Sequence, residues 1–151
     1  DISVDVDTYL SGNILFENGA IAQIFTTFDV YYGRGAQARF EVYGTQGTLV
    51  VPDPNTFGGP VLLLRPEEGE ARQVPLTFGY SENSRGLGLA DMARALRTGR
   101  DSREGWRQTL HVLEILTAFE KSSRSGSYLP LETRYERGAA MANGPVPGIL
   151  D

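Results

Sequence analysis

The chain has 151 residues, 40% hydrophobic and 22% charged, which is enough for one globular domain with a core. Its net charge of −5 and the lack of a Lys/Arg cluster argue against a nucleic-acid partner. The absence of cysteine excludes disulfides, a thiolate nucleophile and Cys-bound metal. No apolar run or signal peptide indicates a membrane, so we expect a cytoplasmic protein without a membrane partner. Because Asp1, not Met, stands directly before a strand-like segment, we also expect a piece of a longer protein.

The first half of the chain predicts two β-hairpins. Residues 2–31 alternate as strands do, and Asn18-Gly19 supplies a two-residue turn between them. The return strand that follows is rich in Ile, Phe and Thr, which favour extended structure. In a second hairpin, residues 38–43 and 47–51 flank a tight glycine turn.

Shorter strands and two helices are expected next. Strands fit residues 61–64 and 71–78, and Pro75 marks the latter as an edge or interrupted strand. Helical spacing then begins near Leu87 and stops at Gly99. In the second helix, which Gly126 ends, the spacing predicts a buried face. That face consists of Trp106, Leu110, Leu113, Leu116 and Phe119.

Strands followed by helices, without βαβ alternation, predict an α+β fold: a mostly antiparallel open β-sheet with helices packed on one face. A short strand at 128–131 closes this domain, which we place at residues 1–136. Gly, Ala and Pro dominate residues 137–151, so we interpret them as a flexible tail.

The predicted sheet carries more apolar residues than two helices can cover. These residues are Ile14, Ile24, Phe28, Phe40, Val42 and Leu49. Antiparallel sheets with an apolar second face often bury it against a partner subunit, so we expect a homo-oligomer formed through this sheet face. The alternative is a solvated second face that is rich in threonine, with Thr26, Thr27, Thr45 and Thr48 as its candidates.

No glycine motif in the chain predicts a phosphate-binding turn. A dinucleotide fingerprint follows a strand and opens a helix, because the helix N-terminus holds the pyrophosphate. Gly44 and Gly47 open a strand instead, and Gly86 and Gly88 precede a helix without a strand before them. We therefore expect no cofactor-binding residue in this chain.

The chain offers one histidine and one lysine for catalysis. His111 has the chemistry of a general acid or metal ligand, but one histidine without cysteine forms no metal constellation. We favour a structural histidine at the edge of the core. Lys121 lies in the last turn of a helix, where a cation complements the helix dipole. We expect no catalytic and no metal-binding residue.

Aromatic and basic residues on a glycine-rich loop form the candidate binding site. Tyr31, Tyr32 and Arg34 follow a strand directly. Aromatic faces and a guanidinium fork suit sugars or small carboxylates. The alternative, a surface loop with ordinary aromatic packing, fits these residues equally well.

A second polar group stands on the loop that enters the first helix. Asn83 and Arg85 could face the same binding site as the aromatic loop. Residues 53–57 could also reach that site, or could reach a neighbouring subunit instead.

Seven segments, in this order and spacing, carry a family resemblance. They are Ser11–Ala20, Phe28–Val30, Phe40–Leu49, Asp53–Asn55, Gly88–Met92, Arg97–Arg100 and Leu110–Glu114. The chain resembles the C-terminal domain of the Gfo/Idh/MocA oxidoreductases, the family of glucose–fructose oxidoreductase and inositol dehydrogenase. The resemblance covers residues from about 3 to 135.

The resemblance implies a two-domain parent enzyme. Its N-terminal Rossmann domain would bind NAD or NADP and supply a lysine from a Glu-Lys-Pro segment, and an Asp/His pair would stand before the sheet. This chain has none of these parts, so no catalytic residue is carried over. Family substrates are often sugars or polyols, bound by loops that match Tyr31, Tyr32, Arg34 and Arg85. The family also commonly oligomerises by packing these sheets face to face.

These observations predict the substrate-binding and oligomerisation domain of an NAD(P)-dependent oxidoreductase that acts on a CH–OH group of a sugar or polyol. The parent protein would be the enzyme, and the fragment alone is expected to be inactive. The alternative is a standalone, non-catalytic module for ligand binding or assembly. The sequence leaves open the substrate, the choice of NAD or NADP, and a dimer or a tetramer.

Overall fold

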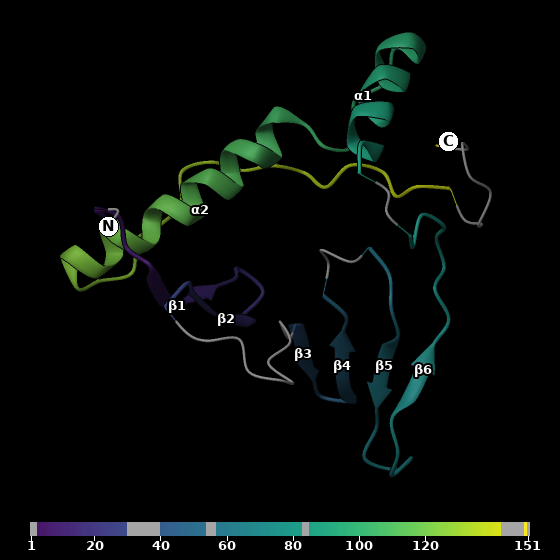
Figure 1. Cartoon of the computed structure of the whole chain (residues 1–151), viewed down its shortest axis with the longest axis horizontal. Coiled ribbons are helices and arrows are strands. Elements are labelled where there is room, and N and C mark those ends of the chain that lie inside the picture. The colour runs from purple at the N-terminus through teal and green to yellow at the C-terminus, as the bar shows by residue number, and fades with distance from the viewer. Residues whose placement is uncertain (1–2, 30–39, 54–56, 83–84, 143–149, 151) are drawn as a thin grey trace. The chain divides into compact units, whose positions relative to one another are not determined.

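The computed structural model describes residues 3–29, 40–53, 57–82, 85–142 and 150. Six strands precede two helices along this part of the chain (Figure 1). They are β1 (Tyr9–Leu15), β2 (Ile21–Thr27), β3 (Phe40–Gly44), β4 (Gly47–Val51), β5 (Val61–Leu64), β6 (Arg72–Val74), α1 (Leu87–Thr98) and α2 (Trp106–Ser125). Every strand pairing is antiparallel, which confirms the α+β fold.

The chain divides into two compact units, and the described strands form one sheet in each. The first unit comprises Asp1–Gly35 and Thr109–Tyr135, and the second comprises Ala36–Gln108 and Glu136–Asp151. β1 and β2 form a two-stranded sheet, whereas β3 to β6 form a four-stranded sheet in chain order. The expected boundary between a domain at 1–136 and a tail at 137–151 stays a prediction.

The first unit contains the first predicted hairpin. Tyr9 of β1 pairs with Thr27 of β2, and this register continues to the pair of Leu15 and Ile21. The loop has three residues rather than two: the Phe16 N–H donates to the Ala20 carbonyl, and Gly19, with φ +85°, donates to the Phe16 carbonyl. This is the three-residue hairpin loop that needs a left-handed residue at its end, a role that glycine fills without strain.

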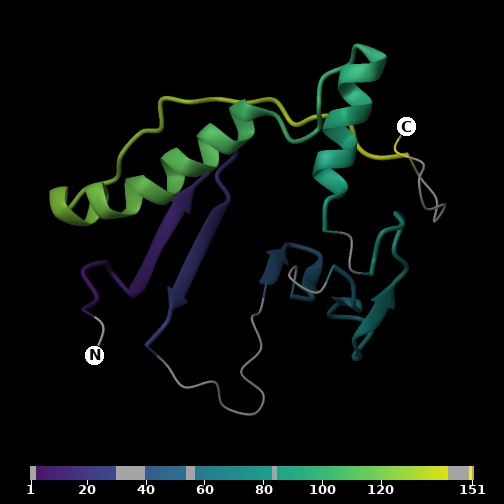
Figure 2. The same cartoon turned by 45° about the horizontal axis from the view of Figure 1, so that its top comes forward.

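One face of this hairpin packs against α2. Alternate residues of β1 are half-buried, and among them Gly12 lies directly beneath Phe119 of the helix. A Cβ atom at Gly12 would lie 2.6 Å from the Phe119 ring, so a larger residue here would force the ring or the helix to shift. Figure 2 shows α2 (green) lying obliquely across the hairpin (purple). The expected packing of a helix on one sheet face is therefore confirmed for this unit.

The opposite face of the hairpin is uncovered in the single chain. Tyr9, Leu15, Ile21 and Phe25 are each more than half exposed, and the rings of Tyr9 and Phe25 meet edge to face. We call these four residues the outer hairpin face. Their exposure agrees with a surplus of apolar sheet residues, while the use of such a face for oligomerisation stays a prediction.

The second unit begins with the glycine-turn hairpin. Phe40 pairs with Val51 at one end and Gly44 with Gly47 at the other. A Cβ atom at Gly47 would collide with the Leu64 carbonyl, because β5 approaches the turn closely. β6 ends at Val74, earlier than the predicted residue 78, since Pro75 has no N–H to donate to a sheet.

α1 confirms the predicted first helix and its end. The Gly99 N–H donates to the Ala95 carbonyl at 2.9 Å, and Gly99 has φ +73°. The helix buries Asp91 and Ala95, each 3% exposed, while Leu96 is 82% exposed. The helical period is therefore correct, but the most buried side of α1 contains a carboxylate.

Two expectations about the C-terminal part are wrong. Most of the predicted buried face of α2 is exposed, from 44% at Leu110 to 70% at Trp106. The half-buried residues of α2 lie mostly on another side of the helix and include His111, Ile115 and Ala118. Residues 128–131 form no strand, and the backbone just beyond them is held by a side chain of α2 instead.

In the described part of the chain, neither helix is long and apolar enough to cross a membrane.

Candidate functional site

Four of the five predicted binding residues, Tyr31, Tyr32, Arg34 and Asn83, lie outside the described residues. The fifth, Arg85, stands two residues before α1 and is exposed. Its guanidinium carbon lies 5.4 Å from the centre of the Phe57 ring, at the distance of a cation–π contact. Phe57 belongs to the loop at 53–57 that was expected near Arg85. The structure thus brings together one predicted residue and one predicted loop.

Two residues with strained backbone occur here, one in the contact itself and one on the neighbouring loop. Phe57 and Tyr80 both have φ 65°, a left-handed conformation that bulky residues adopt at a cost. The loop of Phe57 approaches the loop of Tyr80 and Ser81 so closely that a Cβ atom at Gly58 would collide with the Ser81 carbonyl. Strain of this kind persists where the surrounding structure enforces it, as at ligand sites. Phe57, Gly58, Tyr80, Ser81 and Arg85 are called the paired loops below.

The paired loops can recognise a small polar molecule. An aromatic ring offers an apolar face for the C–H side of a sugar, and a guanidinium donates hydrogen bonds in a planar fork. The five named residues carry no carboxylate, imidazole or thiol, so they supply binding chemistry, while Glu82 is the nearest carboxylate along the same loop as Arg85.

A buried ion cluster in the same unit was not predicted. Asp91 accepts hydrogen bonds from Arg100 Nη2 at 2.6 Å, from the Arg103 backbone N–H at 2.9 Å and from Arg103 Nη1. The Arg100 hydrogen bond, followed by those from Arg103, lowers the pKa of Asp91 from 3.8 to about 2, although burial opposes this shift. The sequence signal was a lone carboxylate on a helix with two arginines just beyond the Gly99 stop.

The ion cluster also reaches the C-terminal segment. Arg103 Nε donates to the Ala139 carbonyl at 3.0 Å, and Nη2 donates to the Ala140 carbonyl at 3.4 Å. A Cβ atom at Gly138 would lie 3.1 Å from Arg103 Cα. The cluster therefore ties α1, the turn after it and residues 138–140 together, which is a structural role.

A second unpredicted cluster lies in the first unit. Glu114 accepts the backbone N–H groups of Glu132 and Thr133, and His111 Nδ1 lies 2.8 Å from Thr133 Oγ1. The half-buried His111 is thus hydrogen-bonded at the edge of α2, as the structural interpretation expected. The spacing of His111 and Glu114, three residues apart on one helix face, was the available signal.

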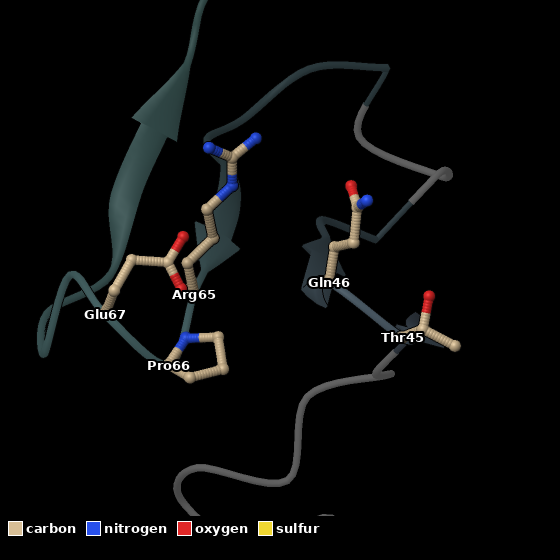
Figure 3. A pocket seen from close by; sticks show the side chains of 5 residues that line it. All are labelled: Thr45, Gln46, Arg65, Pro66 and Glu67. Atoms are coloured by element: carbon tan, nitrogen blue, oxygen red, sulfur yellow. The ribbon is translucent and has the colours of Figure 1, made fainter.

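A shallow polar pocket of about 400 Å³ lies at two turns of the four-stranded sheet. Its lining consists of Thr45, Gln46, Arg65, Pro66 and Glu67 (Figure 3). The Arg65 guanidinium lies 3.9 Å from the Glu68 carboxylate, so part of its charge is already compensated. Ligand sites usually combine apolar walls with a few polar groups, and this pocket has no aromatic wall. The paired loops are the better candidate site.

The expected absence of a cofactor site and of a metal site in this chain stays a prediction. α1 follows a left-handed Gly86 at the end of an irregular segment, and α2 also begins after an irregular segment, so neither helix opens directly from a strand. Within the described ranges, no three His, Cys, Asp or Glu side chains are grouped to hold a metal.

Comparison with known families finds a similarity in the N-terminal part of the chain. Residues 2–50 match the family model of the GFO/IDH/MocA C-terminal domain. The match spans β1 to most of β4 and confirms the resemblance there. The likeness of residues 51–135 stays a prediction. No curated protein and no solved structure matches the chain.

Proposed function

We propose that this chain is the substrate-binding and assembly part of an NAD(P)-dependent oxidoreductase that acts on a CH–OH group of a sugar or polyol. The observation that carries this proposal is the match of residues 2–50 to a C-terminal domain of an oxidoreductase family. The nucleotide, NAD or NADP, would bind to a separate N-terminal domain of the same cytoplasmic parent. The chain alone would bind substrate weakly and would not turn it over.

The paired loops support the substrate side of this proposal. Arg85 and Phe57 combine a guanidinium with an aromatic ring, the pair of groups that suits a polyhydroxylated ligand. Phe57 and Tyr80 have left-handed backbone, a conformation that persists where the surrounding structure enforces it, as it does at ligand sites.

The outer hairpin face supports the assembly side. Tyr9, Leu15, Ile21 and Phe25 lie on one face and are 54–68% exposed. Apolar groups gathered on one sheet face are typical of subunit interfaces. A homo-oligomer that pairs two such faces would remove these residues from water.

The proposal is tested by binding and activity measured on the same preparation. We expect the isolated chain to show no NAD reduction with a panel of sugars and polyols. NMR titration with the same panel should give shifts at the paired loops. The Arg85→Ala variant should weaken this binding at least fivefold, whereas Arg124→Ala, on the exposed surface of α2, should leave it unchanged. NAD reduction by the isolated chain would contradict the proposal.

A second candidate is a standalone ligand-binding or assembly module. The observation in its favour is that the family match ends at residue 50, so most of the chain is outside it. Reading the coding DNA upstream of Asp1 separates the two candidates. A Rossmann glycine turn and a Glu-Lys-Pro segment in frame would support the oxidoreductase, and a start codon directly before Asp1 would support the standalone module.

A further inference from the structure

A carboxylate on α2 holds the chain segment that follows this helix. Glu114 Oε1 accepts the Glu132 N–H at 2.7 Å, and Oε2 accepts the Thr133 N–H at 2.9 Å and the Thr133 hydroxyl. Residues 127–142 form neither helix nor strand, so their backbone donors need partners other than a sheet. One side chain satisfies two consecutive backbone donors of this segment.

These hydrogen bonds keep Glu114 ionised. The Glu132 backbone N–H makes the largest contribution, followed by the hydroxyl and N–H of Thr133, and together they lower the pKa of Glu114 from 4.5 to about 2. At neutral pH the carboxylate is therefore an acceptor only.

The Thr133 hydroxyl joins Glu114 to His111. His111 precedes Glu114 by three residues on α2, and its Nδ1 lies 2.8 Å from Thr133 Oγ1. A hydroxyl has one proton to donate, and in this site it goes to the carboxylate. Oγ1 must therefore accept a hydrogen bond from His111, which requires a proton on Nδ1.

We propose that Glu114, acting through the Thr133 hydroxyl, fixes neutral His111 as the Nδ1–H tautomer and leaves Nε2 as a hydrogen-bond acceptor. Glu114 is a positioning residue in this scheme. The Tyr135 ring, 5.5 Å from the imidazole centre, adds packing to the same side chain. An imidazole in this state binds a hydroxyl or N–H donor at Nε2.

The tautomer is directly measurable because the chain contains a single histidine. In NMR of the tag-free full chain labelled with ¹⁵N-histidine at alkaline pH, the single imidazole ring gives one pattern of nitrogen shifts. We expect Nδ1 to be protonated and Nε2 to be unprotonated. A histidine without partners in water favours the opposite tautomer, so the two outcomes differ clearly.

Two variants separate the tautomer from the attachment of the segment. Thr133→Val removes the hydroxyl but keeps the backbone N–H at 133, so the ring should change to Nε2–H while amide exchange at 132 and 133 stays slow. Glu114→Ala removes both acceptor oxygens, so the tautomer should change and exchange at both amides should quicken at least tenfold. Glu120→Ala is the matched control, because Glu120 is an exposed carboxylate of α2 that pairs with Arg124.

An Nε2–H tautomer in the unaltered chain would overturn the proposal. An unchanged tautomer in Thr133→Val, with helix content retained by circular dichroism, would overturn it as well. Neither result depends on ligand binding at the paired loops, so the test is independent of the proposed function.

Discussion

At the scale of single residues, Asp91 is the carboxylate that we expect to contribute most to the free energy of unfolding. It is 3% exposed and accepts hydrogen bonds from two arginines and one backbone N–H. Removing its charge leaves two guanidiniums without their counter-ion in a mostly buried site. Such a loss costs about 3 kcal/mol in comparable buried pairs.

We therefore expect Asp91→Asn to lower the free energy of unfolding by about 3 kcal/mol in urea denaturation. The nearby exposed Asp101→Asn is the control and should change it by less than about 0.5 kcal/mol. Equal effects of the two substitutions would show that Asp91 has no special structural role.

The lowered pKa of Asp91 predicts that the stability of the fold depends on pH. The folded pKa of Asp91 is about 2, below the ordinary 3.8, so the unfolded chain binds this proton more readily. Its contribution, roughly 2 kcal/mol, is present above pH 3.8 and is lost as the pH falls towards 2. The lowered pKa of Glu114 acts in the same direction. Urea midpoints measured between pH 2 and pH 5 should rise with pH, and the slope should be smaller in Asp91→Asn.

At the scale of elements, the contact between β1 and α2 depends on one missing side chain. Gly12 lies beneath Phe119, and a Cβ atom at this position would lie 2.6 Å from the ring. A methyl group there forces the ring or the helix to move. Overpacking of this kind typically costs about 1–3 kcal/mol.

We expect Gly12→Ala to lower the free energy of unfolding by about 2 kcal/mol. The neighbouring Ser11→Ala, on the exposed face of β1, should have little effect. In the double variant with Phe119→Ala the cost of Gly12→Ala should largely disappear, because the ring it collides with is gone. Additive effects in this cycle would contradict the packing argument.

At the scale of the whole molecule, burial within the single chain is sparse. Of the described residues, Ala95 and Asp91 alone fall in the fully buried class. Large apolar side chains are exposed on the outer hairpin face and along α2. The proposed assembly would cover surfaces of this kind.

We expect the chain to sediment as an oligomer and Phe25→Lys to shift it to the monomer, because a charge on the outer hairpin face must be desolvated on assembly. Leu96→Lys is the control, since Leu96 is 82% exposed on α1, outside this face. A monomeric unaltered chain at micromolar concentration would remove the support for assembly through the hairpin.

Local patterns in the sequence determined the elements. The order of strands and helices, the Gly99 helix end and the glycine turn between β3 and β4 were all predicted, because turn chemistry and periodicity act between near neighbours. The two-residue turn at Asn18-Gly19 was wrong by one residue. The strand at 128–131 was wrong because its neighbours donate to Glu114, a partner that no local pattern identifies.

Of the candidate site, the sequence identified Arg85 and the loop containing Phe57 from their residue types. The tertiary structure alone decided that Phe57 and Tyr80 adopt left-handed backbone, that Asp91 meets two arginines and that Glu114 reaches Thr133. The hydrogen bonds of Asp91 and Glu114 join residues up to 19 positions apart along the chain. Their energies depend on distance, burial and the direction of each donor, and only the folded chain fixes these quantities.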